Sequence, residues 1–493
     1  MKTKYIWLML LLLGFASCAN DDDATTPTEP AVELTAGTAD FSRFVSLGNS
    51  LTAGFQDNAL FIAAQQSSFP NLAAQKFGLL GGGTFTQPLM NDNIGGLLFN
   101  GFPNPQFGPR LAINPLTTEI GPVSGTPSTE VFAPSNGPYN NLGVPGAKSF
   151  HLLFDGYGNP ANLPLGLANP YYVRMASSPS ATIIGEAMAQ QPTFFSLWIG
   201  NNDVLGYAIS GGDGSNPITP SAGPPGIGFD ETIGFIISTL TSGGAKGVVA
   251  NIPDVTSIPF FTTVTHDVIP LDEATADAVN SAYAPYNGGL QLALLNGLIS
   301  EEEAAYRTIQ FVESANNSVV IEDESLTDLS GLGLPNYRQA TADDLFVLTS
   351  ASFIGTEAIP GNPLTVNGVA IPLADKWVLL PSEQQEIKAA TAAFNGVIES
   401  AAQNAGLALA DANNILNQIS NGSYSSGNFI FTSGLVLGGI FSLDGVHPHS
   451  RGNAIMANEF LKAIDATYGS TFEASGNLYD PGEFPTNFPA SLQ

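Results

Sequence analysis

Three side chains of this sequence have the types and the spacing that nucleophilic catalysis requires. Ser50 could supply a hydroxyl nucleophile, and Asp444 and His447 stand only three residues apart. That spacing lets the Asp444 carboxylate accept a hydrogen bond from one imidazole nitrogen within a single loop, so that the other nitrogen faces outward as a base. A fourth group, the Asn202 side-chain amide, could donate a hydrogen bond to a developing negative charge. The set therefore contains the parts of an activated serine.

The serine and the amide each follow an apolar, strand-like run. Residues 41–47 lead through Gly48 and Asn49 to Ser50, and residues 193–199 lead to the segment 200–203. Open parallel sheets bind their ligands outside the carboxyl ends of the strands, where both segments would then place their polar side chains. A helix that begins at Ser50 would also bring an anion-binding N-terminus to the site. A serine at such a turn can equally serve only as a helix N-cap.

Strands and helices alternate along much of the chain, which predicts βαβ units and a mostly parallel sheet. Two stretches rich in Gly, Pro or irregular sequence, at about 81–138 and 258–375, are interpreted as insertions. We expect the first to lie over one face of the sheet and the second to form loops or a small cap domain. Residues 469–493 are interpreted as a C-terminal tail. The other predicted elements are helices at 60–77 (interrupted at Pro70), 181–190, 382–404 and 452–468, and strands at 247–252 and 407–410.

With these elements in place, the chain resembles the GDSL, or SGNH, hydrolase superfamily. Each motif is common by itself, but all four occur here in the family's order. The segment that leads to the serine carries Asn49 where the family usually has an aspartate. The matching segments are Gly48-Asn49-Ser50-Leu51, Gly146 within residues 141–147, Gly200-Asn201-Asn202-Asp203, and Asp444-Gly445-Val446-His447.

The resemblance implies a three-layer α/β/α, flavodoxin-like fold and a serine esterase or lipase that needs no cofactor and no metal. Ser50 would attack an ester carbonyl, with His447 as base and Asp444 as the triad acid. The backbone N–H groups of Ser50 and Gly146 and the Asn202 amide would form the oxyanion hole. Acyl glycerides and other lipids, small-molecule esters and acylated glycans are all compatible substrates. The rival interpretation is a non-catalytic surface lipoprotein of the same fold that binds glycan or lipid.

Other polar or aromatic residues receive structural interpretations. Asp203 is expected to bond within its own turn, and Trp198 to belong to the core. His449, two residues from His447, is not expected to bind metal, because a proline separates the two and no cysteine is near. The acidic run 322–324 lacks the spaced ligands and the glycine of an EF-hand and is interpreted as a solvated turn.

The charge balance restricts the partners. The chain has 493 residues, with 14 Lys and Arg against 43 Asp and Glu, and a formal net charge of −29. Such a surface repels phosphate backbones and anionic lipid headgroups, which argues against nucleic acid as a partner and against electrostatic docking on a membrane.

The N-terminal residues predict export. Residues 1–17 read as a signal peptide, with Lys2 and Lys4 before an apolar run too short to span a membrane. Cys18, the one cysteine of the chain, follows as in a bacterial lipobox and would carry the lipid anchor. Residues 18–40 would be a disordered tether, and the run 21–23 looks like the surface-export signal of Bacteroidetes lipoproteins. These features predict an outer-membrane lipoprotein of the cell envelope. A plain secretory signal with an incidental cysteine, and a plain solvated spacer, are the alternatives.

Overall fold

Five parallel strands form the centre of the protein in the computed structural model, which describes residues 32–135, 137–362 and 365–493. Three of them, β1 (Phe44–Gly48), β7 (Phe194–Trp198) and β8 (Lys246–Ala250), are almost entirely buried, as expected for parallel strands covered on both faces. The edges are β6 (Asn141–Gly143) and β15 (Ala408–Ala410). The order is β15-β8-β7-β1-β6, which read from β6 is 2-1-3-4-5 in chain order, so the strand order reverses between β1 and β7. The α/β class and the parallel sheet are confirmed.

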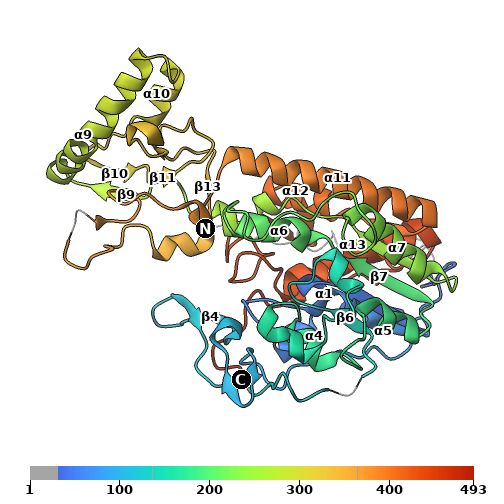
Figure 1. Ribbon diagram of the computed structural model, residues 1–493. Coiled ribbons are helices and arrows are strands. Elements are labelled where there is room, and N and C mark those ends of the chain that lie inside the picture. The colour runs from blue at the N-terminus through green and yellow to red at the C-terminus, as the bar shows by residue number, and fades with distance from the viewer. Residues whose placement is uncertain (1–31, 136, 363–364) are drawn as a thin grey trace, which may run out of the picture. The chain divides into compact units, whose positions relative to one another are not determined.

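Helices cover both faces of the sheet (Figure 1). Trp198 packs on Phe69 of α3 (Phe69–Gly78) and Phe460 of α13 (Ser450–Tyr468). Its neighbour Leu197 instead faces α7 (Phe229–Thr241) and α11 (Pro381–Ala405). Consecutive strand residues point to opposite faces, so these two helix pairs form the two outer layers. A further helix, α5 (Ile183–Ala189), contacts β1, β6 and α7 and belongs to the second layer.

Local signals set most helix boundaries where the sequence predicts them. The predicted helix 60–77 is broken into α2 (Ile62–Gln66) and α3, and Pro70 lies in the first turn of α3, where its missing N–H is not needed. At the end of α11, Gly406 adopts a left-handed φ of 65°. Several elements differ from the prediction, among them an edge strand and two helices. Residues 141–143 form the edge strand β6 rather than a turn, and neither α4 (Pro170–Met175) nor α12 (Ala412–Ser420) was predicted.

The first insertion is built from two short hairpins around a buried cation. They are β2 (Leu98–Phe99) with β3 (Phe102–Pro103), and β4 (Leu111–Ile113) with β5 (Ile120–Pro122). The fully buried guanidinium of Arg110 donates to the carbonyl oxygens of Phe488, Pro489 and Leu492. The C-terminal segment 469–493 is therefore packed against the insertion rather than projecting as a tail.

The second insertion has its own hydrophobic core, which includes Val279, Leu290, Phe311 and Ile321. Buried Arg338 ion-pairs with both Asp323 and Asp344, so the interpretation of residues 322–324 as a solvated turn is wrong for Asp323. Figure 1 shows this insertion beside the start of α11. Its elements are α8 (Pro259–Thr262), β9 (Ile269–Leu271), α9 (Glu273–Leu295), α10 (Glu301–Arg307), β10 (Ser314–Asn317), β11 (Val320–Glu322), β12 (Tyr337–Gln339) and β13 (Leu345–Phe346), with β14 (Val378–Leu379) pairing from outside it.

The folded part begins earlier than the sequence predicts. Residues 34–493 form one compact unit. The Thr38 N–H donates to the carbonyl of Tyr468 at 2.9 Å, and the Thr35 N–H donates to the hydroxyl of Thr471 at 2.9 Å. The last residues assigned to the tether are thus held against the end of α13. The expected signal peptide, Cys18 and the run 21–23 lie outside the described residues. Within the described ranges, no helix is both long and apolar enough to cross a bilayer.

Candidate active site

Ser50 lies two residues beyond the carboxyl end of β1, as the first residue of α1 (Ser50–Ala53). The chain turns sharply at Gly48, where a Cβ atom would lie 2.2 Å from Thr52 Oγ1 and 2.4 Å from the Trp198 carbonyl oxygen. Only glycine fits such a close approach. The serine hydroxyl therefore stands at the end of the sheet, next to the point where the strand order reverses.

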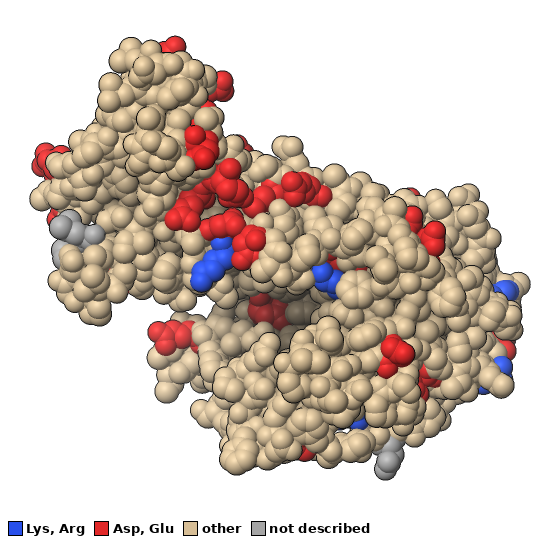
Figure 2. All heavy atoms as spheres, viewed as in Figure 1, with Lys and Arg blue, Asp and Glu red and all other residues tan. Residues whose placement is uncertain are grey.

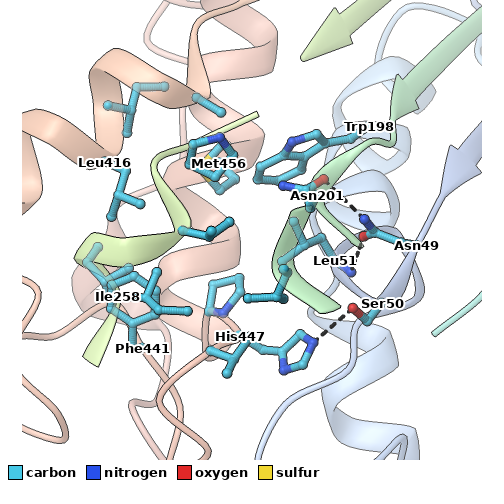
Figure 3. Close-up of a pocket in the computed structure, with 18 of the residues that line it drawn as sticks. Asn49, Ser50, Leu51, Trp198, Asn201, Ile258, Leu416, Phe441, His447 and Met456 are labelled. Carbon is cyan, nitrogen blue, oxygen red and sulfur yellow. Dashed lines mark hydrogen bonds between the residues drawn. The ribbon is translucent and has the colours of Figure 1, made fainter. Parts of the chain in front are cut away.

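His447 and Asp444 complete a hydrogen-bonded chain with Ser50. The distance from His447 Nε2 to Ser50 Oγ is 2.8 Å, and that from His447 Nδ1 to Asp444 Oδ2 is 3.0 Å. Figure 3 shows the imidazole pointing at the hydroxyl. The three side chains predicted to form the triad thus come together, although 397 residues separate Ser50 from His447.

The Asp444 carboxylate accepts four hydrogen bonds, which hold it ionised. Oδ1 accepts from the N–H groups of Val446 (2.8 Å) and His447 (2.9 Å), and Oδ2 accepts from the His447 imidazole and from the Asn58 N–H (2.9 Å). Burial by itself would raise the pKa of Asp444, but the charge of His447 and these hydrogen bonds outweigh it and lower the pKa to about 2. The carboxylate is therefore charged at any pH at which the protein would work.

A turn that the sequence analysis did not identify positions this acid. The Leu443 N–H donates to Asp57 Oδ1 at 3.0 Å, and the Asp57 N–H donates to the Ser442 hydroxyl at 3.0 Å. Asp57 and Asn58 have φ angles of 52° and 63°, a left-handed conformation that Asp and Asn tolerate better than most residues. The adjacent Asp-Asn pair was the available signal for such a turn. Burial raises the pKa of Asp57 to about 6.

A hydrogen bond links Asn202 to Ala147, the residue that follows Gly146. Asn202 lies in the first turn of α6 (Asn201–Ile209), and its Nδ2 donates to the Ala147 carbonyl at 2.9 Å. Gly146 adopts a φ of 80° and is exposed, and a Cβ atom there would find nothing closer than 3.9 Å. Asn202 is thus linked to the segment that contains Gly146 and lines the same cavity as Ser50, and there is free space above Gly146.

Asp203 fixes this arrangement. It is fully buried and accepts hydrogen bonds from the Ser149 N–H (2.9 Å) and hydroxyl (2.7 Å), which ties the loop of Gly146 and Ala147 to α6. Its role is structural, as predicted, but its partner is in another segment of the chain rather than in its own turn.

Asn49 has a structural explanation. Its Oδ1 accepts from the Leu51 N–H and caps α1, while its Nδ2 donates to Asn201 Oδ1 at 3.1 Å. An aspartate could make the first bond but has no hydrogen for the second. The amide at position 49, where the resemblance would place an aspartate, therefore has a hydrogen-bond acceptor in Asn201. The hydrogen bond between Ser50 and His447 is present beside it.

An apolar cavity of about 90 Å³ opens beside the serine (Figure 3). The polar lining groups belong to the segments around Ser50, Asn201 and His447, and the rest of the wall is hydrophobic. Trp198 is buried in the core as predicted, but it also forms part of this wall. Residues that follow β8 and β15 supply much of the remainder. The apolar lining is Leu51, Trp198, Leu205, Pro253, Val255, Ile258, Ala412, Ile415, Leu416, Ile419, Ile440, Phe441, Val446, Pro448 and Met456.

His449 and the first insertion do not contribute to this cavity. His449 is buried, and its Nδ1 accepts from the Gly452 N–H at the start of α13. The structure thus gives it a capping role.

Comparisons of the chain with protein-family models, with curated proteins and with solved structures found no match.

Proposed function

We propose that this protein is a serine esterase or lipase of the GDSL/SGNH hydrolase superfamily. The observation that carries the proposal is the chain of hydrogen bonds from Ser50 Oγ through the imidazole of His447 to the Asp444 carboxylate, at 2.8 and 3.0 Å. Structural serines do not require an imidazole whose second nitrogen is held by a buried carboxylate, whereas a nucleophile does.

The reaction follows from these contacts. Ser50 Oγ attacks the ester carbonyl carbon while His447 Nε2 takes its proton, and Asp444 stabilises the imidazolium that forms. The tetrahedral intermediate collapses when the C–O bond to the alcohol breaks and His447 returns the proton to the leaving oxygen. Water then attacks the acyl-enzyme in the same way and releases the acid and Ser50.

The negative charge of each tetrahedral intermediate needs fixed donors. The Ser50 N–H is the first of α1 and has no intrahelical acceptor. Gly146 and the Asn202 amide supply the other two donors in this proposal. The Ala147 carbonyl engages one hydrogen of the Asn202 amide, so the second hydrogen is available for the oxyanion.

The cavity beside Ser50 favours esters with an apolar chain. A cavity of about 150 Å³ lined by aliphatic and aromatic side chains binds benzene, so the 90 Å³ here has room for a chain of roughly four carbons before it reaches solvent or must displace side chains. We therefore propose small-molecule or lipid esters with short to medium acyl chains as substrates, in preference to acetylated glycans.

The test is hydrolysis of p-nitrophenyl esters from acetate to palmitate, together with covalent labelling by a fluorophosphonate, in which Ser50 Oγ displaces fluoride from phosphorus. We expect hydrolysis, and one phosphonyl group attached to Ser50 by peptide mass spectrometry. Ser50→Ala should lose both, with turnover lowered by about 10⁴-fold or more. Ser238→Ala, which removes an exposed hydroxyl on α7, should change neither.

Folded protein that hydrolyses none of the esters and takes up no phosphonate would contradict the proposal. It would favour the rival function, a surface lipoprotein that binds glycan or lipid.

We also propose a cell location for this protein, as an outer-membrane lipoprotein that is anchored through Cys18 and exposed to the surface. Metabolic labelling with a fatty-acid analogue, lost in Cys18→Ser, tests it.

A further inference from the structure

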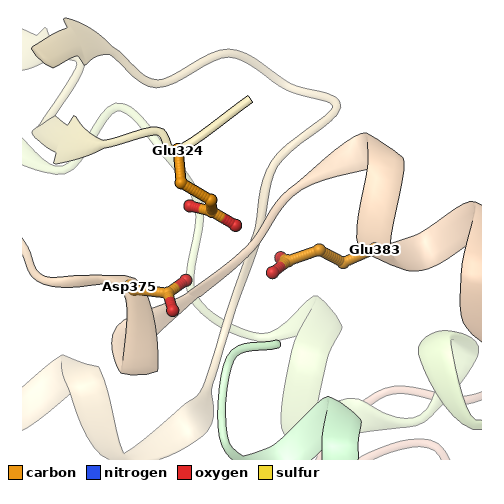
Figure 4. A group of neighbouring side chains, drawn as sticks. All are labelled: Glu324, Asp375 and Glu383. Atoms are coloured by element: carbon orange, nitrogen blue, oxygen red, sulfur yellow. The ribbon is translucent and has the colours of Figure 1, made fainter. Parts of the chain in front are cut away.

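Three carboxylates converge at the junction between the second insertion and the catalytic part of the protein. Glu324 follows β11, Asp375 belongs to the 3₁₀ turn η8 (Asp375–Trp377), and Glu383 lies in the first turn of α11. One oxygen of each lies within 4.8 Å of the others. Figure 4 shows the three side chains pointing toward a common centre from three separate segments.

Two oxygens of this cluster are buried without a hydrogen-bond donor. Glu383 is only 4% exposed, and while its Oε2 accepts from the Leu380 N–H at 2.7 Å, its Oε1 has no hydrogen-bond donor. Figure 4 shows the carboxyl group of Glu383 pointing toward Glu324 and Asp375. Asp375 Oδ1 is likewise inaccessible and unpartnered. Buried carboxylate oxygens are nearly always hydrogen-bonded, paired with a cation or bound to a metal, so these two indicate a missing positive partner.

Lys376, the residue after Asp375, lies over the ring of Trp377 instead of pairing with the cluster. In the described part of the chain, no Lys or Arg lies within ion-pair distance of the three carboxylates. Glu322 and Asp213 add further negative charge around Asp375. Figure 2 shows the resulting concentration of acidic side chains at this junction. Burial and the neighbouring charges raise the pKa of Asp375 to about 7.

The backbone of a double-glycine turn closes one side of the cluster. A Cβ atom on Gly212 would lie 1.8 Å from Glu383 Oε1, and one on Gly211 would lie 2.3 Å from the Asp375 carbonyl oxygen. Both glycines have left-handed φ angles, 71° for Gly211 and 82° for Gly212. The backbone therefore approaches the Glu383 carboxylate closely, in a conformation that glycine adopts easily, and covers this side of the cluster, while Glu324 remains exposed.

We propose that Glu324, Asp375 and Glu383 bind a divalent cation of the Ca²⁺ type. The donors are all oxygens, which suit Ca²⁺ and Mg²⁺ rather than metals that prefer nitrogen or sulfur. Ca²⁺ is favoured because it accepts six to eight oxygens in irregular geometry and would complete its shell with carbonyl oxygens and water. The ion would link the second insertion to α11 and so fix the insertion on the catalytic part of the protein.

The experiment is calorimetric titration of EDTA-treated protein with CaCl₂, and separately with MgCl₂, at pH 8, with thermal unfolding measured alongside. We expect one Ca²⁺ per chain, with a Kd of about 10⁻³ M or tighter. At a free Ca²⁺ of 100 times Kd, the Tm should rise by about 3 °C for a chain of this size. Neither measurement depends on ester hydrolysis, so the site can fail while the proposed function stands, and the reverse.

Three variants make the test specific. Glu324→Gln, at an exposed position after β11, should fold normally and weaken Ca²⁺ binding at least tenfold, and Glu383→Gln should do the same if α11 keeps its cap. Glu399→Gln removes one charge from an exposed site on the same helix and should leave binding unchanged. The proposal is overturned if millimolar Ca²⁺ neither binds nor raises the Tm. It is equally overturned if Glu324→Gln binds Ca²⁺ as tightly as the wild type does. A third contrary result is a Glu324→Gln variant with a higher Tm than the wild type and no response to Ca²⁺, which would indicate that the carboxyl groups share protons.

Discussion

Replacing Asp444 by asparagine separates the chemical role of this residue from its structural one. The carboxylate accepts two bonds at each oxygen: Val446 and His447 N–H at Oδ1, and His447 Nδ1 and Asn58 N–H at Oδ2. An amide has one oxygen, so one pair must face its NH₂ group. Keeping the oxygen toward the two N–H groups at Oδ1 is favoured, because the imidazole can change tautomer and a backbone N–H cannot.

The expected magnitudes follow from that orientation. The amide NH₂ would donate to His447 Nδ1, which moves the imidazole proton to Nε2, where it faces Ser50 Oγ and can no longer accept the serine proton. In serine proteases with a Ser-His-Asp triad the corresponding change lowers kcat by about 10⁴, or roughly 5.5 kcal/mol of transition-state stabilisation. The N–H of Asn58, an exposed residue, loses its acceptor and can bond to water instead, so the free energy of unfolding falls by about 0.5–1.5 kcal/mol.

The assay compares kcat/KM on p-nitrophenyl butyrate with the free energy of unfolding in urea. Asp465→Asn is a matched control, because Asp465 accepts bonds from the Ser470 hydroxyl and from the N–H groups of Phe472 and Glu473, 15 residues into α13 and far from Ser50. It should lose a similar stability and keep its activity. The reasoning is refuted if Asp444→Asn retains more than a tenth of wild-type activity, or if both variants lose activity in parallel.

Three further outcomes are expected. Asn202→Ala should lower kcat by about 10²–10³ with little change in KM, measured on the same ester, since the amide hydrogen not bonded to Ala147 would donate to the oxyanion and not to the ground-state ester; an unchanged kcat would remove Asn202 from the site. Leu416→Trp, which fills the cavity, should lower the octanoate-to-acetate ratio of kcat/KM at least about tenfold, whereas a constant ratio would mean that the acyl chain lies elsewhere. The folded-state pKa of Asp57, about 6, is above its usual 3.8, so the folded state binds the proton more tightly and stability falls as pH rises. Wild-type protein should lose about 2 kcal/mol more than Asp57→Asn between pH 4 and pH 7 in urea unfolding, and parallel pH profiles would contradict this.

The triad could be predicted from the sequence because its signals are local. Ser50 follows a mostly apolar strand and a glycine, and Asp444 and His447 share one loop, so their types and spacing indicated the chemistry without knowledge of long-range contacts. The parallel sheet was predictable for the same reason, because β1, β7 and β8 are mostly apolar runs. The edge strand β6 was not, since three residues rich in Asn and Gly carry no strand signal and pair only because β1 lies beside them.

The contacts that complete the site depend on residues distant in sequence. Nothing near Asp203 indicates Ser149 as its partner, and nothing near Asp323 indicates Arg338. The sequence shows that an acidic residue is present but not which buried donor it meets, so Asp323 was misinterpreted as solvated. The wall of the cavity was missed in part because α12 is short and its apolar residues could equally have packed inward on the sheet. The Gly- and Pro-rich insertion 81–138 packs with residues 488–492, which no local signal in either segment indicates.

The hydrogen bond between Ser50 and His447 also determines when the protein can become active. Because 397 residues separate the two, a ribosome that has made Ser50 and its strand must still add most of the chain before the base exists. The same holds for Asn58 and Asp444, and for Arg110 and the carbonyls of residues 488–492. A nascent or prematurely terminated chain that ends before residue 444 would carry the serine without its base and acid. In the proposed mechanism such a fragment is inert, so an incomplete chain has no hydrolase activity during its synthesis.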